Sequence, residues 1–259
     1  MNDTRRILLK AALTGALAGL PVGAGAAAPS ARMSIRALAF DAFPVFDPRP
    51  IQALALSLFP GEGAALMNAW RTRLFEYQWL RALGGQYVDF MQTVGESLDF
   101  SAAQLGLSIT PTMRAQLVGA WSNLEVWPDA ADSLKRLRDT GLRLAFLSNM
   151  TTMMLRDGLR KAGLQDLFEA VLSTDQIRTY KPDPRAYQLG MDALRLRKEE
   201  ILFVAFAGWD VAGAKWFGYP TFWVNRQGQP GERLGAAADA EGPDLAALLS
   251  FVSRGEHAA

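Results

Sequence analysis

Asp41 stands where a short apolar segment ends, and this position gives its carboxylate a chemical use. Residues 37–40 read Ala-Leu-Ala-Phe, and a loop that contains Pro44 follows directly. Open α/β sheets form their sites at the carboxyl ends of buried strands, so a carboxylate at this point would face such a site. An aspartate placed there can attack a substrate as a nucleophile and form a covalent intermediate.

Polar residues also follow three later apolar segments. They are Ser148 and Asn149 after residues 142–147, Lys181-Pro182-Asp183 after residues 171–173, and Asp210 after residues 201–206. Taken singly, a serine or asparagine at a strand end is usually a turn residue or a helix cap, and Lys-Pro-Asp is usually a loop. The ends of parallel strands share one edge of a sheet, so four such groups after four successive strands favour a common site.

The segments between these residues predict a doubly wound α/β core. Strands are expected at residues 35–40, 142–147, 171–173, 201–206 and 221–224, with helices at 134–137, 153–162, 184–194 and 211–217. Continuous apolar strands that alternate with helices are typical of a parallel sheet covered on both faces. The pattern from residue 50 to about 119 is only helical, which predicts a helical cap inserted after the first strand. The expected division is a core at 33–48 and 122–255 and a cap at 49–121.

Composition excludes several kinds of site. The chain has no cysteine and a single histidine, His257, near its end. Thiol nucleophiles, disulfides and thiolate metal sites are therefore absent, and a histidine base is not expected. With 27 basic and 26 acidic residues, the chain shows no charge excess that would favour nucleic acid as a partner.

Residues 1–28 are predicted to be an export signal. Arg5 and Arg6 form a twin-arginine pattern, an apolar segment covers residues 11–20, and Ala24-Gly25-Ala26 offers a cleavage site. About 15 apolar residues are too few for a membrane anchor, which needs about 20. The expected partner is the twin-arginine translocase and the expected location is the periplasm. The sequence does not decide the oligomeric state, and it is compatible with a homodimer.

The order of Asp41, Ser148-Asn149, Lys181-Pro182-Asp183 and Asp210 resembles the four motifs of the haloacid dehalogenase superfamily. The predicted cap is similar to the (S)-2-haloacid dehalogenase (type II) branch at residues 70–81 and 87–90, and Tyr187 and Trp209 also match. The resemblance covers about residues 35–250. It implies a Rossmann-like core with a helical cap, and hydrolysis of short 2-haloalkanoic acids to 2-hydroxy acids.

The resemblance also implies a role for each matched residue. Asp41 would be the nucleophile that forms the ester, Asp210 would orient the water that hydrolyses it, and Lys181 would pair with either carboxylate. Ser148 would hold the substrate carboxylate, and Tyr187 would support Lys181 or the nucleophile. The expected halide cradle is Arg71 with Asn149, and the expected apolar wall is Phe43, Phe75, Phe90 and Trp209.

No metal and no cofactor are expected. Phosphatases of this superfamily need a second aspartate two residues after the nucleophile, and this chain has Phe43 there. A phenylalanine cannot donate a proton. The surroundings of Asp210 also lack a second acidic residue for Mg²⁺, which requires several oxygen ligands.

Three departures from the family pattern keep alternatives open. The usual threonine after the nucleophile is Val45, and a serine and an asparagine before the last aspartate are Ala205 and Ala207. Losing groups that orient reactive side chains commonly costs about 10- to 100-fold in activity. A phosphatase-like hydrolase of the superfamily and a non-catalytic binder of carboxylates or other anions are therefore the alternatives to a dehalogenase.

Overall fold

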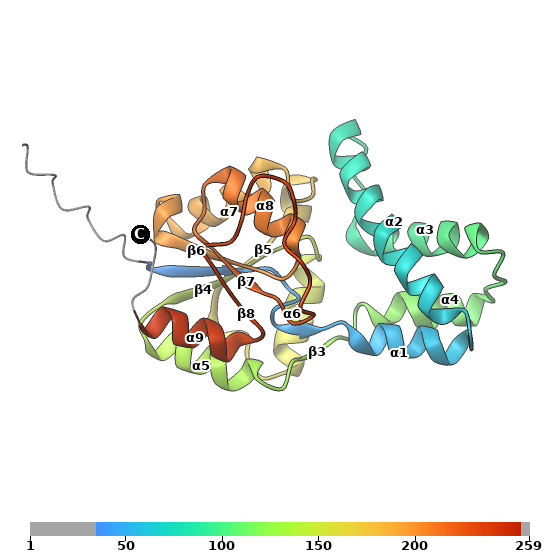
Figure 1. The fold of residues 1–259 in the computed structure, drawn as a ribbon, viewed down its shortest axis with the longest axis horizontal. Helices are drawn as coiled ribbons and strands as arrows, with labels where there is room; N and C mark the ends of the chain where they lie inside the picture. Colours follow the sequence, from blue (N-terminus) through green and yellow to red (C-terminus); the bar gives the residue numbers. More distant parts are fainter. Residues whose placement is uncertain (1–34, 255–259) are drawn as a thin grey trace, which may run out of the picture. The chain divides into compact units, whose positions relative to one another are not determined.

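The computed structural model describes residues 35–254, and the expected export signal lies outside this range (Figure 1). Six parallel strands form the main sheet in the order β5-β4-β1-β6-β7-β8. Their bounds are β1 Ala37–Phe40, β4 Arg143–Ser148, β5 Phe168–Ser173, β6 Ile201–Ala205, β7 Thr221–Val224 and β8 Ala240–Gly242. The predicted doubly wound α/β fold is confirmed.

Helices cover both faces of this sheet (Figure 1). One face carries α5 (Ala130–Asp139), α6 (Thr152–Lys161) and α9 (Leu245–Ser253), and the other carries α7 (Pro184–Leu194) and α8 (Gly208–Phe217). Three short 3-10 helices lie in the connections, at Gln165–Leu167, Thr174–Ile177 and Lys198–Glu200. Each face has its own cluster of buried apolar side chains, which explains why the central strands β1 and β6 are continuous apolar runs.

Four helices form the cap between the two strands of a small antiparallel pair. They are α1 (Arg49–Leu58), α2 (Gly63–Gly84), α3 (Phe90–Gln104) and α4 (Pro111–Ala120), and the pair is β2 (Phe46–Asp47) with β3 (Glu125–Val126). Asp89 and Thr110 begin α3 and α4 by accepting hydrogen bonds from backbone N–H groups of the first turn. No helix among residues 35–254 is both long enough and apolar enough to cross a bilayer.

The topology places the end of β1 at the point where the strand order changes direction. β1 pairs with β4 on one side and β6 on the other, with Phe40 opposite Phe146 and Val204. The chain builds β4 and β5 on the first side before it crosses to β6. Crevices for ligands open at such switch points, so Asp41 directly follows the strand best placed to supply one.

The structure differs from the expectations in its last third. The strand β8 and the helix α9 were not predicted, and α8 begins at Gly208 and not at Val211. The segment Gly208-Trp209-Asp210 reads as a loop in sequence, yet the N–H groups of Asp210 and Val211 both donate to the carbonyl of Ala207. Asp210 therefore lies in the first turn of a helix, which fixes its side chain more firmly than a loop would.

Candidate active site

A buried lysine joins the two aspartates that end β1 and begin α8. The Nζ atom of Lys181 is 2.9 Å from Oδ1 of Asp41 and 2.5 Å from Oδ2 of Asp210. The lysine side chain is only 1% exposed, and the Asp210 side chain only 2%. The structure therefore brings these three residues together, as the sequence predicts. One cation between two anions leaves the trio with a net negative charge, which favours a nucleophilic role for the more accessible carboxylate.

Burial and neighbouring charges have opposing effects on the pKa values of Asp210 and Lys181. Burial raises the pKa of Asp210 to about 6, and the neighbouring charge of Asp41 adds to the rise, while Lys181 opposes it. Burial alone would lower the pKa of Lys181, but the carboxylates of Asp210 and Asp41 together raise it above its ordinary value. The lysine therefore stays a cation at neutral pH, and Asp210 is mostly ionised there.

Tyr187 contacts Asp210, and not the residues that the sequence led us to expect. Its hydroxyl donates to Oδ1 of Asp210 at 2.7 Å, and burial raises the pKa of the phenol well above 10. Gly213 allows this approach, because a Cβ atom there would come within 2.3 Å of the tyrosine oxygen. Both oxygens of Asp210 are therefore held, one by Lys181 and one by Tyr187.

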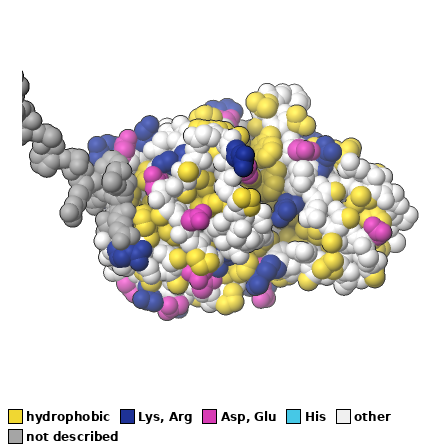
Figure 2. Space-filling model, viewed as in Figure 1, with side chains coloured by type: hydrophobic (Ala, Val, Ile, Leu, Met, Phe, Trp, Pro, Cys, Tyr) yellow, Lys and Arg dark blue, Asp and Glu magenta, His cyan; other side chains and the backbone are white. Residues whose placement is uncertain are grey.

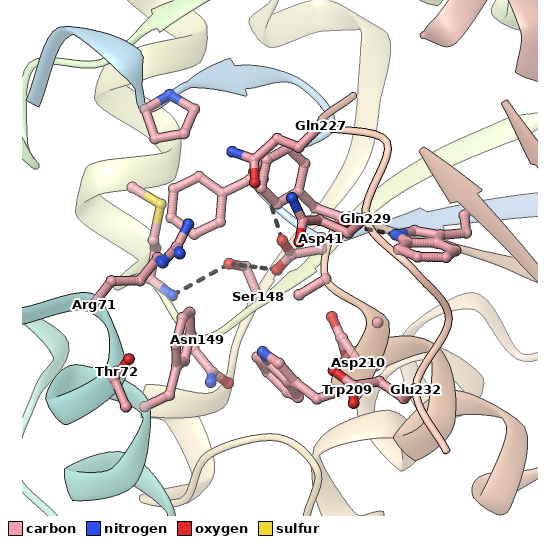
Figure 3. A pocket seen from close by; sticks show the side chains of 18 of the residues that line it. Asp41, Arg71, Thr72, Ser148, Asn149, Trp209, Asp210, Gln227, Gln229 and Glu232 are labelled. Carbon is pink, nitrogen blue, oxygen red and sulfur yellow. Dashed lines mark hydrogen bonds between the residues drawn. The ribbon is translucent and has the colours of Figure 1, made fainter. Parts of the chain in front are cut away.

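Asp41 is positioned through both oxygens but unequally. Its Oδ1 accepts from Lys181 and, at 3.4 Å, from the hydroxyl of Ser148, whose oxygen also accepts the N–H of Met150 at 3.2 Å. Among residues 35–254, its Oδ2 accepts a hydrogen bond only from the backbone N–H of Phe43, at 3.2 Å. Oδ2 is thus the oxygen with free lone pairs, and its carboxylate borders the cavity (Figure 3).

The backbone after Asp41 is held from outside, although Val45 stands where the family has a threonine. The indole of Trp127 donates to the carbonyl of Phe43 at 2.9 Å, and its backbone N–H donates to the carbonyl of Val45. The guanidinium of Arg226 donates to the carbonyl of Pro44 at 2.9 Å. Three successive carbonyls of this loop therefore have fixed donors.

Asn149 is held by three hydrogen bonds at the end of β4. Its Oδ1 accepts the backbone N–H of Lys181 at 2.9 Å and the hydroxyl of Thr174 at 3.3 Å. Its Nδ2 donates to Oε1 of Gln78, in the cap helix α2, at 2.8 Å. The side chain therefore belongs both to the core and to the contact between core and cap.

A cavity of about 620 Å³ opens above Asp41, between the core and the cap. The expected halide-binding residues Arg71 and Asn149 line it, as do Asp41, Ser148 and Asp210, and Figure 3 shows their arrangement. The four expected wall residues, Phe43, Phe75, Phe90 and Trp209, also line it. On the face drawn in Figure 2, hydrophobic side chains gather between core and cap with basic side chains beside them.

The sequence reasoning missed one wall of this cavity, formed by the loop after β7. Its lining residues are Gln227, Gln229, Pro230, Gly231, Glu232 and Arg233. Asn225 closes the loop, because its side chain donates to the carbonyl of Gln229 at 2.9 Å and accepts the N–H of Gln229 at 2.8 Å. Figure 3 shows the amide of Gln227 turned toward Asp41. The polar residues directly after the fifth expected strand were the available signal.

The departures at Ala205 and Ala207 lie next to the reacting groups. Ala205 ends β6 and is fully buried, while Ala207 precedes α8 without a side-chain cap and lines the cavity.

No group of three His, Cys, Asp or Glu side chains that could hold a metal ion occurs in the described part of the chain.

Comparisons with known proteins agree with this geometry. A family model for haloacid dehalogenase-like hydrolases matches residues 32–218. The chain is 38% identical to an (S)-2-haloacid dehalogenase of Pseudomonas sp. (strain YL) over 218 residues, 84% of this chain and 94% of that protein.

Solved structures give the same result. An L-2-haloacid dehalogenase is similar with a TM-score of 0.82 and 40% identity, over 85% of this chain and 99% of that one. The enzyme of Xanthobacter autotrophicus with chloropropionic acid covalently bound is similar with a TM-score of 0.76 and 34% identity, over 85% and 98%. The chain belongs to the haloacid dehalogenase-like hydrolases, in the branch of the L-2-haloacid dehalogenases.

Proposed function

We propose that this protein hydrolyses short (S)-2-haloalkanoic acids to 2-hydroxy acids through an ester on Asp41. The observation that carries the proposal is the buried Lys181 between Asp41 and Asp210, at the floor of a cavity with an arginine and an aromatic wall. A relative of known structure with chloropropionic acid covalently bound supports the covalent route. We assign the roles below to the matched residues on the same basis.

The first half-reaction forms the ester and releases the halide. Oδ2 of Asp41 attacks C2 of the substrate from the side opposite the halogen, the carbon–halogen bond breaks, and its electron pair leaves with the halide. Departing chloride needs no proton, but its growing negative charge needs fixed donors in a water-poor site. Asn149, which three hydrogen bonds hold, supplies a fixed donor, and Arg71, an exposed residue that lines the cavity, supplies a charged one. Inversion at C2 follows from attack on the opposite side.

The second half-reaction hydrolyses the ester. A water molecule attacks the carboxyl carbon of Asp41 while Asp210 accepts its proton, as its pKa near 6 permits at neutral pH. The oxyanion grows on Oδ1, 2.9 Å from the Lys181 ammonium, which stabilises it. Collapse breaks the bond between Cγ and Oδ2 of Asp41, and Oδ2 leaves as the hydroxyl oxygen of the 2-hydroxy acid, which takes up the proton from Asp210. Asp41 is left as a carboxylic acid and releases its proton to solvent, which restores the carboxylate. One oxygen of Asp41 then comes from water.

Halide release from the separate enantiomers of 2-chloropropionate tests this proposal. We expect the (S) enantiomer to yield one chloride and one 2-hydroxypropionate of inverted configuration, and the (R) enantiomer to yield none. The rate should be unchanged by a chelator and by added Mg²⁺, because Phe43 occupies the position of the second aspartate of the phosphatases. Phosphate release from phosphate esters, or dependence on Mg²⁺, would instead favour a phosphatase. Binding of 2-chloropropionate without turnover would favour a non-catalytic binder.

We also propose that the protein is exported through the twin-arginine translocase and acts in the periplasm. The support is the sequence of residues 1–28, with its paired arginines, short apolar segment and Ala24-Gly25-Ala26. We expect N-terminal sequencing of the periplasmic protein to begin near Ala27, and replacement of both Arg5 and Arg6 by lysine to keep the precursor inside the cell. A periplasmic protein that begins at Met1 would contradict cleavage.

We also propose that the protein forms a homodimer, which analytical ultracentrifugation can test.

A further inference from the structure

We infer that Gln78 of the cap helix α2 is a positioning residue for the departing halide. It acts through Asn149, whose one remaining N–H it aims at the leaving group. The inference rests on the proposed function, since it assumes that Asn149 contacts the halide.

The buried face of α2 is apolar except at this position. Its buried residues are Gly63, Leu66, Trp70, Leu74 and Gln78, and the last four recur every fourth residue along one face. Gln78 is fully buried. Burying an amide among apolar side chains is unfavourable unless it is hydrogen-bonded, so a glutamine at the end of this stripe needs a reason. Its Nε2 has no hydrogen-bond partner among the described residues, so the contact through Oε1 has to supply that reason.

The contact through Oε1 completes the hydrogen bonds that fix Asn149. An asparagine amide offers two acceptor sites on its oxygen and two N–H donors. Both acceptor sites of Asn149 are used, by the backbone N–H of Lys181 and by the hydroxyl of Thr174. Because the backbone N–H of Lys181 can only donate, the side-chain atom of Asn149 that it contacts must be the oxygen. Nδ2 therefore faces Gln78, and one N–H is consumed by the 2.8 Å bond to Oε1.

One N–H of Asn149 is left, and its direction is determined by the other three bonds. The two N–H bonds of an amide lie in one plane at a fixed angle, so holding one of them orients the other. Asn149 lines the cavity beside Asp41, and Figure 3 shows it on the same side as Arg71. Without Gln78, the side-chain amide of Asn149 would keep the hydrogen bonds to its oxygen. Its NH₂ group would no longer be held in a plane that directs the remaining N–H toward the halide.

Gln78 also links the halide site to the position of the cap. Arg71 precedes it by seven residues, about two helical turns, so both side chains lie on the same side of α2. The bond from Gln78 to Asn149 joins this side of α2 to the end of β4. This hydrogen bond therefore links the segment of α2 that carries Arg71 to the core donor Asn149.

The test compares leaving groups. Gln78→Met keeps nearly the same volume and leaves only a weak sulfur acceptor, and Gln78→Leu, which has no acceptor, is a second variant should the first fold poorly. Gln92→Met is the control, because Gln92 is an exposed cap residue whose side chain bonds only Glu96 within the described part of the chain. Single-turnover halide release is measured with (S)-2-chloropropionate and (S)-2-iodopropionate, and thermal unfolding is measured alongside.

We expect Gln78→Met to slow chloride release by about tenfold, the usual size of an orienting contact, and iodide release by less than about threefold. Chloride concentrates more charge and leaves less readily, so it depends more on an aimed donor. In an Asn149→Ala background the same substitution should change neither rate further, because the partner through which it acts is gone.

Equal losses for the two halides, or additive losses with Asn149→Ala, would assign Gln78 to cap stability and overturn the inference. The proposed function fails in a different way, namely if the unaltered protein releases no halide. If the protein releases halide but Asn149→Ala leaves the chloride-to-iodide ratio unchanged, the halide does not contact Asn149 and the role of Gln78 is refuted with it.

Discussion

Asp41→Asn should lower halide release by about four to six orders of magnitude, which is the usual loss when a covalent nucleophile is removed. The substitution keeps the size of the side chain and removes its charge, so the backbone contact of Oδ2 with Phe43 loses little. Asp210 cannot replace it, since Lys181 and Tyr187 hold both of its oxygens. Asp47→Asn is the control, because Asp47 is a buried carboxylate that pairs with Arg49 and does not itself line the cavity. We expect it to keep the rate within about threefold.

Isotope labelling separates this covalent route from direct hydrolysis. With enzyme in excess, one turnover in ¹⁸O-water should give unlabelled hydroxy acid and one labelled oxygen on the peptide that contains Asp41. Label in the product of the first turnover would mean that water attacks C2 directly, and the ester mechanism would then be wrong.

Lys181→Met should have the second largest effect, on both activity and stability. It leaves Asp41 and Asp210 as neighbouring carboxylates without a shared cation, and breaking a buried ion pair in this way costs about 3–5 kcal/mol. We expect halide release to fall at least about a hundredfold, because the oxyanion of ester hydrolysis loses its donor. Lys215→Met is the control, since Lys215 pairs with Asp239 at a partly exposed site where such pairs contribute about 0–1 kcal/mol.

The stability of Lys181→Met should also depend on pH with a definite sign. Removing the lysine takes away the main influence that lowers the pKa of Asp210, so this pKa rises above its value of about 6. A carboxyl whose pKa is higher in the folded than in the unfolded state binds its proton more tightly when folded. Stability is then greatest at low pH and falls as pH rises through the folded pKa. The melting temperature of the variant should therefore drop, relative to the unaltered protein, between about pH 5 and pH 8. A pH-independent difference would mean that Asp210 does not respond to Lys181.

The residues at strand ends could be predicted from the sequence because topology alone brings them together. Asp41, Lys181 and Asp210 each follow an apolar run, and parallel strands carry their ends to one edge. Side-chain partners were harder, because they depend on distances that no sequence pattern contains. Tyr187 was expected near Lys181 or the nucleophile, but a close approach permitted by Gly213 brings its hydroxyl to Asp210.

Local sequence patterns were not enough to assign two parts of the site. Gln78 continues a regular helical stripe, so its spacing places it on the buried face but does not identify Asn149 as its partner. The loop at residues 227–233 has neither helical nor strand periodicity, and only the position of β7 at the same sheet edge brings it to the cavity. Tertiary packing decided both.

The shared lysine makes the two half-reactions thermodynamically linked. The charge of Asp41 helps to hold the pKa of Asp210 at about 6, and ester formation removes that charge. The pKa of Asp210 therefore falls when the ester forms, and Lys181 is left to a single carboxylate. Ester formation on Asp41 thus weakens proton binding at Asp210. By reciprocity, a proton on Asp210 disfavours ester formation on Asp41. Below about pH 6 the first turnover of halide release should be accompanied by a fractional release of protons, which the enzyme at pH 8 would lack. The base is thereby deprotonated most completely when its water must be activated, without any movement of the chain.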